Sequence, residues 1–185
     1  MGRTVYYAAM SLDGYIAEPE ERLDWLMGFD GPGYAGDDGS SVQDAMSTFM
    51  AEVGSMVMGS KTYEFLLREG SWPYGDTPTW VYTSRELETI EGAGALKFAS
   101  GNVTELHAEM LAAADGKDVW MIGGGNLGSQ YVAARLLDQV RVTVVPVILG
   151  DGLPLFAEPL AEPMRLLDTT SFDNGMVELS YEIVR

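Results

Sequence analysis

The feature that most constrains this chain is a unit that occurs three times. A short apolar segment rich in β-formers runs into a turn of small residues, at residues 56–58, 80–83 and 119–122. A helical pattern follows the first and the last of these turns. Alternation of strands and helices predicts an α/β fold with a mostly parallel sheet between helices. In such a sheet the carboxyl ends of the strands form the edge at which ligands bind.

Hydrophobic periodicity extends this prediction to the whole chain, with loops at residues 11–17 and 28–41. We expect eight strands, at residues 5–10, 55–58, 79–83, 96–99, 118–122, 140–148, 165–172 and 176–184. We expect helices from Ser40 or Ser41 to Val53, and over Ser60–Glu69, Val103–Ala114 and Asn126–Ala134. The last two strands flank Asp173-Asn174-Gly175, a strong hairpin signal. Pro146 interrupts the longest β-branched run, which is typical of a sheet edge or a bulge. No linker or repeat divides residues 1–185, so we expect one domain.

The charge of the chain excludes several partners. The sequence has 28 acidic and 11 basic residues, a formal net charge of −17. Nucleic-acid binding needs a basic stripe, and an anionic membrane surface would be repelled. The N-terminus has no signal-peptide pattern and no apolar run reaches about 18 residues, so we expect a cytoplasmic protein. An anionic cofactor must be held locally, by backbone N–H groups, helix dipoles and one or two basic side chains.

The chain has no cysteine and one histidine, His107. Disulfides, iron–sulfur clusters and thiol nucleophiles are therefore excluded, and we expect no metal site. His107 falls in the predicted helix Val103–Ala114, on a face that reads as solvated. We interpret it as a surface residue and not as a catalytic one.

The three turns carry groups suited to anions. Gly123–Gly125 precedes a helix, Gly59–Thr62 adds a lysine and two hydroxyls, and Ser84-Arg85 follows the third strand. Each turn alone fits an ordinary cap, but three on one sheet edge predict a site for two or three phosphate groups. Residues 123–128 satisfy G-x-G-x-x-G, yet no βαβ unit with an acidic ribose ligand follows, so a Rossmann domain is excluded. No G-K-[ST] is present, so a Walker loop is excluded too.

At this point the chain resembles the dihydrofolate reductase superfamily, above all the reductase half of the bifunctional riboflavin deaminase–reductase and its stand-alone relatives. Residues 8–17 (AAMSLDGYIA) are similar to the first strand and the mobile loop over the nicotinamide. Met58–Tyr63 is similar to the Met-Gly-Arg-x-Thr helix start, and Gly123–Gln130 to the second phosphate turn. Gly150-Asp151 with Phe156 matches the late loop. The resemblance covers nearly the whole chain and implies a dihydrofolate-reductase-like three-layer sandwich.

The resemblance implies NADPH as cofactor and a homodimer as the assembly. Ala9 and Ile16 would line the nicotinamide, the two glycine turns would hold the phosphates, and residues 83–85 would meet the adenosine ribose. The implied cofactor residues are Ala9, Ile16, Gly59, Ser60, Lys61, Thr62, Thr83, Ser84, Arg85, Gly123, Gly124, Gly125, Asn126 and Leu127. Ser60 stands where the family has an arginine that helps to hold the 2′-phosphate. Lys61 and Arg85 could compensate as charge-assisted donors, so NADH remains open.

The catalytic groups are less defined. True dihydrofolate reductases carry an acid in the first helix, and here Asp44 is the nearest candidate, although an acid in the first turn also suits the helix dipole. Thr143 falls where the family has a threonine partner for that acid, or it is ordinary sheet packing. We predict hydride transfer to a small heterocyclic, pterin- or pyrimidine-like substrate, with residues 11–17 and 28–41 gating the pocket and Trp25 and Tyr34 as stacking candidates. The alternatives are a dinucleotide-binding module without turnover and a structural α/β domain.

Overall fold

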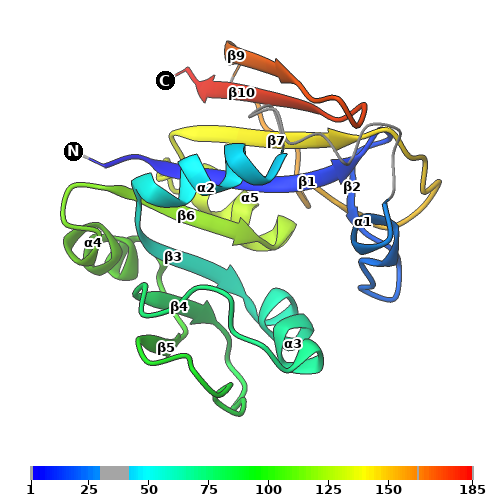
Figure 1. Cartoon of the computed structure of the whole chain (residues 1–185). Coiled ribbons are helices and arrows are strands. Elements are labelled where there is room, and N and C mark those ends of the chain that lie inside the picture. Colours follow the sequence, from blue (N-terminus) through cyan, green and yellow to red (C-terminus); the bar gives the residue numbers. More distant parts are fainter. Residues whose placement is uncertain (1, 30–41, 162, 185) are drawn as a thin grey trace.

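A computed structural model describes residues 2–29, 42–161 and 163–184 of the chain. An eight-stranded sheet runs through the described part in the order β5-β4-β3-β6-β1-β7-β10-β9 (Figure 1). Its strands are β1 (Thr4–Ser11), β3 (Val53–Gly59), β4 (Thr79–Tyr82), β5 (Leu96–Ala99), β6 (Asp118–Gly123), β7 (Gln139–Val145), β9 (Met164–Ser171) and β10 (Val177–Ile183). Pairing is parallel from β5 to β7 and antiparallel from β7 to β9. The predicted mostly parallel sheet with an antiparallel C-terminal end is confirmed.

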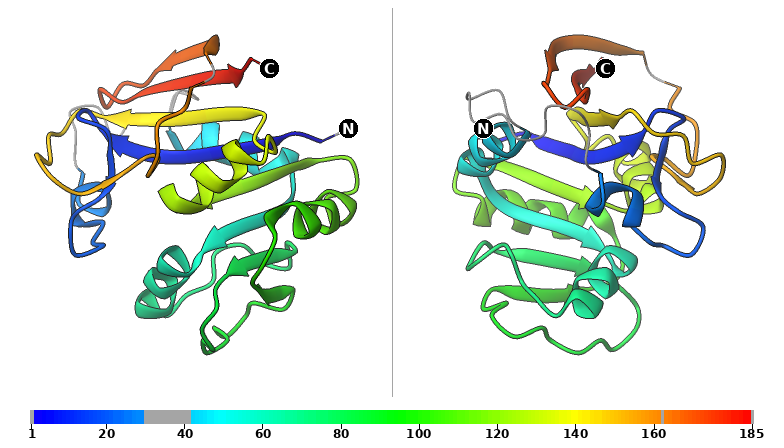
Figure 2. Two further views of the ribbon diagram at one scale, coloured as in Figure 1. Left: turned by 180° about the vertical axis from the view of Figure 1, so that it is seen from behind. Right: turned by 45° about the vertical axis from the view of Figure 1, so that its right-hand side comes forward.

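Helices cover both faces of this sheet, as the views in Figure 2 show. They are α2 (Val42–Glu52), α3 (Ser60–Glu69), α4 (Val103–Ala113) and α5 (Gly125–Ala133). Phe49 of α2 and Tyr63 of α3 pack on one face, against clusters that contain Met56 and Met58 of β3. α4 and α5 pack on the opposite face, in the cluster that contains Val57. Successive residues of β3 thus serve opposite layers, and the three-layer sandwich is confirmed.

Local sequence sets several boundaries as expected. α3 ends at Gly70, whose φ of 68° allows its N–H to reach the carbonyls of Leu66 and Leu67. Asn102 caps α4 by accepting a hydrogen bond from the Thr104 N–H. In the β9–β10 turn Gly175 has a φ of 85°, and the Asn174 side chain accepts from the Met176 N–H. The predicted hairpin is confirmed.

His107 corrects one expectation. Its side chain is buried, not solvated: the ring Nε2 lies 2.6 Å from the Thr4 hydroxyl, and the ring meets Tyr131 edge to face. α4 is rich in alanine, so its buried face has weak contrast with the exposed one, and periodicity alone misplaced the histidine. Its role is nevertheless in packing, between α4 and β1.

The strand that precedes Pro146 also differs from expectation. β7 lies inside the sheet, between β1 and β10, and ends at Val145. Pro146 therefore follows the strand and marks neither an edge nor a bulge, because its missing N–H terminates the pairing.

Three short elements were not predicted. α1 (Asp24–Met27) lies in a segment that stands beside the sheet, and β2 (Tyr15–Ala17) pairs with β8 (Leu153–Pro154) in a second small sheet. We expected residues 11–17 to be a loop, since three residues give no detectable period. None of the described helices is long and apolar enough to cross a membrane.

Candidate active site

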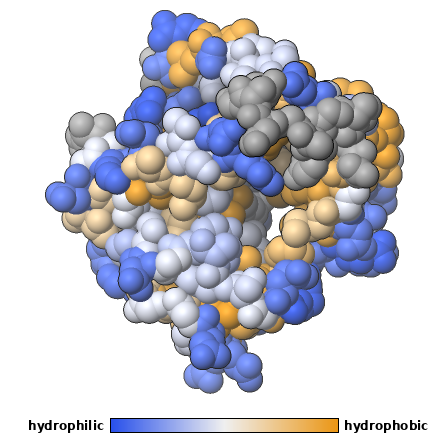
Figure 3. Space-filling view, in the orientation of Figure 1, coloured by the Kyte–Doolittle hydropathy of each residue, from blue (hydrophilic) through white to orange (hydrophobic). Residues whose placement is uncertain are grey.

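A cleft of about 460 Å³ opens at the carboxyl ends of β1 and β6. Its walls come from the starts of α3 and α5, from the α1 segment and from the β2–β8 sheet. Figure 3 shows the surface hollowed where the α1 segment stands away from the body of the molecule. The lining is mostly apolar and includes Ala9, Ile16, Leu26, Phe65 and Ile122. This is the edge of the sheet that the strand order of an α/β fold assigns to ligands.

The start of α5 presents backbone N–H groups at this cleft. Its N-cap residue, Gly124, has a φ of 104°, and no side chain caps the helix. The first intrahelical bond to Gly124 comes from the N–H of Gly128, so the N–H groups of residues 125–127 point out of the helix end. At Gly125 a Cβ would lie 2.7 Å from the Pro154 carbonyl oxygen, so only glycine fits against β8. The N-terminus of α5 is therefore an open, positively polarised end.

The start of α3 has the same design and faces the start of α5. Its N-cap, Gly59, is extended, and no side chain caps the helix. A Cβ on Gly59 would meet nothing within 4 Å, whereas a Cβ on Gly124 would approach the Gly59 Cα to 3.8 Å. Thr62 adds its hydroxyl beside Gly123. Two uncapped helix starts that meet at glycines fit the diphosphate of a dinucleotide, because both supply donors without a side chain in the way.

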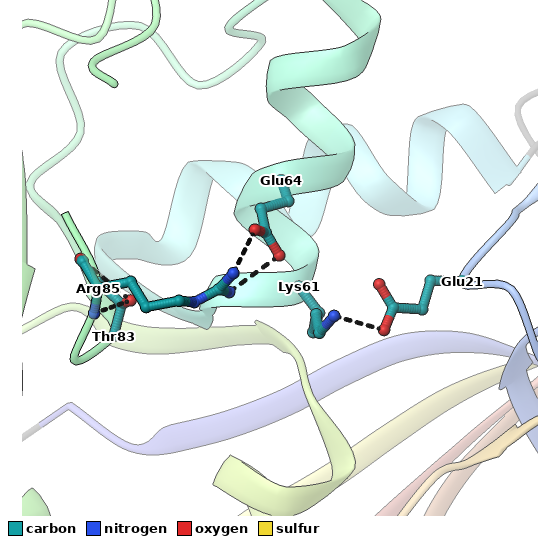
Figure 4. Close-up of polar contacts among 5 residues, drawn as sticks. All are labelled: Glu21, Lys61, Glu64, Thr83 and Arg85. Carbon is teal, nitrogen blue, oxygen red and sulfur yellow. Dashed lines mark hydrogen bonds and ion pairs between the residues drawn. The ribbon is translucent and has the colours of Figure 1, made fainter. Parts of the chain in front are cut away.

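Both basic residues that the sequence assigned to the cofactor are paired with carboxylates (Figure 4). Lys61 Nζ lies 2.8 Å from Glu21 Oε1. The Arg85 guanidinium donates to both oxygens of Glu64, at 2.8 and 3.0 Å. This hydrogen bond holds the pKa of the Glu64 carboxyl below its ordinary value and raises the pKa of Arg85. The Arg85 N–H donates to the hydroxyl of Thr83, which fixes the turn after β4.

The Asp13 side chain joins the turn before β2 to the backbone at residues 149 and 150, a role that the sequence analysis did not predict. Its carboxylate accepts from the Ser11 hydroxyl at 2.7 Å and from the N–H groups of Leu149 and Gly150 at 3.1 and 2.7 Å. These bonds, that of Ser11 above all, lower the pKa of Asp13 to about 2. This one side chain joins two segments that are far apart in the sequence. The first segment, residues 8–17, resembles the family's first strand and mobile loop, and the second, at residues 149–151, resembles its late loop.

The structure gathers most of the predicted cofactor residues. Those that line the cleft are Ala9, Ile16, Lys61, Thr62, Gly123, Gly124, Gly125 and Asn126. Gly59 and Ser60 begin α3 beside them, and Leu127 is a core residue of the first turn of α5. Thr83, Ser84 and Arg85 follow β4, one strand further along the sheet edge. Their assignment to a cofactor stays a prediction.

Comparison with known proteins identifies the family. The family model described as the RibD C-terminal domain matches residues 66–178. The uncharacterised protein YwjB of Bacillus subtilis is 33% identical over 187 residues, with 97% of each chain covered. The chain belongs to the RibD C-terminal domain family.

Solved structures agree with this RibD C-terminal domain assignment. A structure described as a putative riboflavin biosynthesis protein from Shewanella sp. PV-4 superimposes with a TM-score of 0.80 at 26% identity, and 99% of each chain is covered. Dihydrofolate reductase from Enterococcus faecalis, solved with NADP(H) and RAB-propyl, superimposes with a TM-score of 0.65 at 18% identity, over 100% of this chain and 98% of that one. The fold is that of the dihydrofolate reductase superfamily, as the motifs predicted.

Neither candidate catalytic residue of this RibD C-terminal domain is among the described residues that line the cleft. Asp44 is exposed in the first turn of α2 and is not among the described lining residues. Thr143 is buried on β7, where it pairs in register with Ala9, and its hydroxyl lies 3.3 Å from that of Tyr7. Their catalytic roles stay predictions.

Thr143 belongs to a buried polar cluster that we define as Tyr7, Arg141, Thr143 and Glu178. The Tyr7 hydroxyl donates to Glu178 at 2.5 Å, and Arg141 Nε donates to the same carboxylate at 2.7 Å. Burial raises the pKa of Tyr7 to about 12, and the bond to Glu178 adds to the effect. The guanidinium also lies over the rings of Tyr7 and Phe49. Alternation placed Glu178 in a strand but gave no sign that its carboxylate is buried.

Two stacking candidates have different outcomes. Trp25 packs with Val145, Phe172 and Met176 and does not line the described cleft. Tyr34, with the rest of residues 30–41, lies outside the described residues.

Proposed function

We propose that this chain is a reductase that transfers hydride from a reduced nicotinamide dinucleotide to a C=N or C=O group of a small heterocycle. One observation carries the proposal: two uncapped, glycine-flanked helix starts face each other at the rim of an apolar cleft. The helix starts suit a diphosphate. The apolar cleft suits the nicotinamide ring and a planar substrate ring, because hydride transfer between them needs water to be excluded. Family membership supports reductase chemistry.

The dinucleotide would supply the hydride, and the protein would supply binding, orientation and exclusion of water. The N–H groups at the starts of α3 and α5 would hold the diphosphate, with the hydroxyl of Thr62 beside them. Ala9 on β1 and Ile16 on β2, which both line the cleft, would contact the nicotinamide. NADPH is the cofactor that the family resemblance favours.

The lining also limits the substrate. The charged side chains among the described lining residues are Glu21 and Lys61, which pair with each other. Residues 30–41 contain no lysine or arginine. A substrate phosphate would thus find no unpaired cation among these residues, and burying an unpaired anion is costly. A neutral, pterin- or pyrimidine-like ring is the better fit.

The proton for the reduced atom would come from ordered water. Glu21 is the acid among the described lining residues, and its carboxylate is occupied by Lys61 at the mouth. The exposed position of Asp44 favours a second candidate function, a dinucleotide-binding module without turnover. Both functions need dinucleotide binding at the two helix starts, and they differ only in whether hydride is transferred to a substrate.

The test has two parts. Thermal melts with NADPH and NADH measure binding: a ligand at about 100 times its Kd adds about 2.7 kcal/mol of stability, a Tm rise of roughly 5–10 °C for a chain of this size. Oxidation of either dinucleotide, followed at 340 nm with a panel of neutral carbonyl and imine heterocycles, measures turnover. Binding with turnover supports the reductase, binding without turnover on any compound supports the module, and no binding of either dinucleotide refutes both.

The cytoplasmic location expected from the sequence and the homodimer implied by the family resemblance remain part of this proposal. Light scattering of the purified chain at several concentrations tests the dimer. A mass equal to that of one chain, 20.1 kDa, at all of them would rule it out.

A further inference from the structure

The turn after β4 is the outer end of the cofactor path, if the proposed function holds. In the proposed site the nicotinamide lies in the cleft and the diphosphate lies between the starts of α3 and α5. The adenosine would then extend beyond the carboxyl end of β3. The next strand in the sheet is β4, whose carboxyl end continues into Thr83 and Arg85. The residues at this turn are therefore placed to distinguish a ribose 2′-phosphate from a 2′-hydroxyl.

Arg85 is held at this turn by two sets of contacts. Its backbone N–H donates to Thr83 Oγ1 at 3.0 Å, and the Thr83 hydroxyl lies 3.3 Å from the Arg85 carbonyl. Its guanidinium forms a two-pronged pair with Glu64, which comes from the second turn of α3 (Figure 4). The Glu64 side chain is 24% exposed and that of Arg85 50%. The carboxylate is therefore the less exposed partner of the pair.

The two cations that the sequence assigned to the cofactor are each paired with a carboxylate, and Arg68, whose charge also acts on Glu64, donates to the Glu21 carbonyl. Glu64 neutralises Arg85, Glu21 neutralises Lys61, and the helix start carries Ser60 in place of a basic residue. The segment after the turn adds acids at residues 86, 88 and 91. A 2′-phosphate dianion would approach a paired cation and several carboxylates, and interactions between charges a few ångströms apart are worth kilocalories near a protein surface. A ribose with a neutral 2′-hydroxyl avoids that repulsion.

We propose that Glu64 is the residue that sets dinucleotide specificity, by neutralising Arg85 so that the site accepts NADH about as well as NADPH. Arg85 is the latent 2′-phosphate ligand, and Glu64 decides whether it acts as one. The proposal rests on the proposed dinucleotide site but not on any particular substrate.

The experiment measures Kd for NADPH and NADH with the wild-type chain and with Glu64→Gln, by quenching of tryptophan fluorescence. Glutamine keeps the size of Glu64 and one acceptor oxygen, removes the charge, and cannot accept from both guanidinium nitrogens. We expect wild type to favour NADPH over NADH by less than about tenfold, and Glu64→Gln to tighten NADPH about tenfold, or 1.4 kcal/mol. NADH affinity should change by no more than about twofold, because its 2′-hydroxyl is neutral.

Three controls sharpen the result. Glu69→Gln makes the same charge change at the exposed C-terminal end of α3 and should leave the NADPH:NADH ratio unchanged. Arg85→Ala combined with Glu64→Gln should abolish the gain. Competition by 2′,5′-ADP against 5′-ADP reads the same preference without the nicotinamide, and the gain should shrink at high salt.

The outcomes separate the two proposals. A wild-type preference for NADPH above about 100-fold, or a Glu64→Gln ratio equal to that of Glu69→Gln, overturns the role of Glu64 while leaving the reductase standing. Failure of every dinucleotide and of both ADP isomers to bind overturns the site itself, and the role of Glu64 with it.

Discussion

Two polar regions of this molecule differ in how their hydrogen bonds are used. In the cluster of Tyr7, Arg141, Thr143 and Glu178, the polar side chains bond to one another under α2. At the starts of α3 and α5, backbone donors are left uncapped around glycines. Buried polar groups are normally satisfied within the protein, so donors left open at a cleft indicate a ligand. The first region stabilises the fold, and the second is the region in which to look for function.

The comparison predicts its largest effect at Glu178. Glu178→Ala should lower the free energy of unfolding by about 3 kcal/mol, because Arg141 keeps a partly buried charge without its carboxylate. Urea unfolding at pH 7 measures this loss. Dinucleotide affinity at temperatures where the variant is folded should match wild type. A large loss of affinity with intact folding would show that the cluster belongs to the site.

The helix starts should respond in the opposite way. Gly124→Ala places a side chain at a φ of 104° in the turn that we propose binds the diphosphate, and it should weaken dinucleotide binding about 100-fold, or 2.7 kcal/mol. Gly92→Ala is the matched control, since its φ is 87° and a Cβ there meets nothing within 4 Å, but it lies away from the cleft. Calorimetric titration with NADPH and NADH measures both variants. Equal affinities in the two variants would contradict the helix-start site.

We expect a smaller effect from substitution of Asp44, because it is not expected to act as a catalytic acid. Since its side chain is exposed and outside the described lining, Asp44→Asn should change kcat by less than about threefold with any substrate found, whereas loss of a catalytic acid costs about 100-fold or more. Steady-state kinetics from pH 5 to 9 would show it. A large drop in kcat with an altered pH profile would restore Asp44 as the proton source.

The smallest expected effect concerns Asp13. Its pKa is lowered to about 2 in the folded chain, so its contribution to stability is present above the ordinary carboxyl pKa and is lost as the pH falls towards 2. Asp13→Asn should therefore lower Tm slightly at pH 7, and the difference from wild type should vanish near pH 2. Melts across this range test it, and a difference that persists at the acid end would assign the effect to lost packing.

The sequence predicted the sheet well because β3, β6 and β7 are apolar runs bounded by clear turn residues. The glycine turns were found for the same reason: glycine after a strand and before a helix has a local signature. Parts that depend on contacts distant in sequence were missed. Glu178 is buried by pairing with a tyrosine 171 positions earlier, and Asp13 bonds backbone groups at residues 149 and 150.

The sequence also could not show which charged side chains are paired. Lys61 and Arg85 were predicted to bind the cofactor from their positions beside the turns, but a sequence does not show that each has a carboxylate partner. That information comes from where Glu21 and Glu64 lie. The resemblance implied NADPH, with Lys61 and Arg85 compensating for the arginine that Ser60 replaces. The carboxylate partners of these two residues lead to a different expectation for the 2′-position.

The segment before α1 is attached to α3 at two places. Lys61 contacts the Glu21 side chain, and Arg68, two helical turns further along, donates to the Glu21 backbone carbonyl at 3.3 Å. An anion that draws Lys61 away would leave the second attachment in place. The segment would then stay joined to α3 through the Arg68 hydrogen bond, so loss of the Lys61 contact would not by itself detach it.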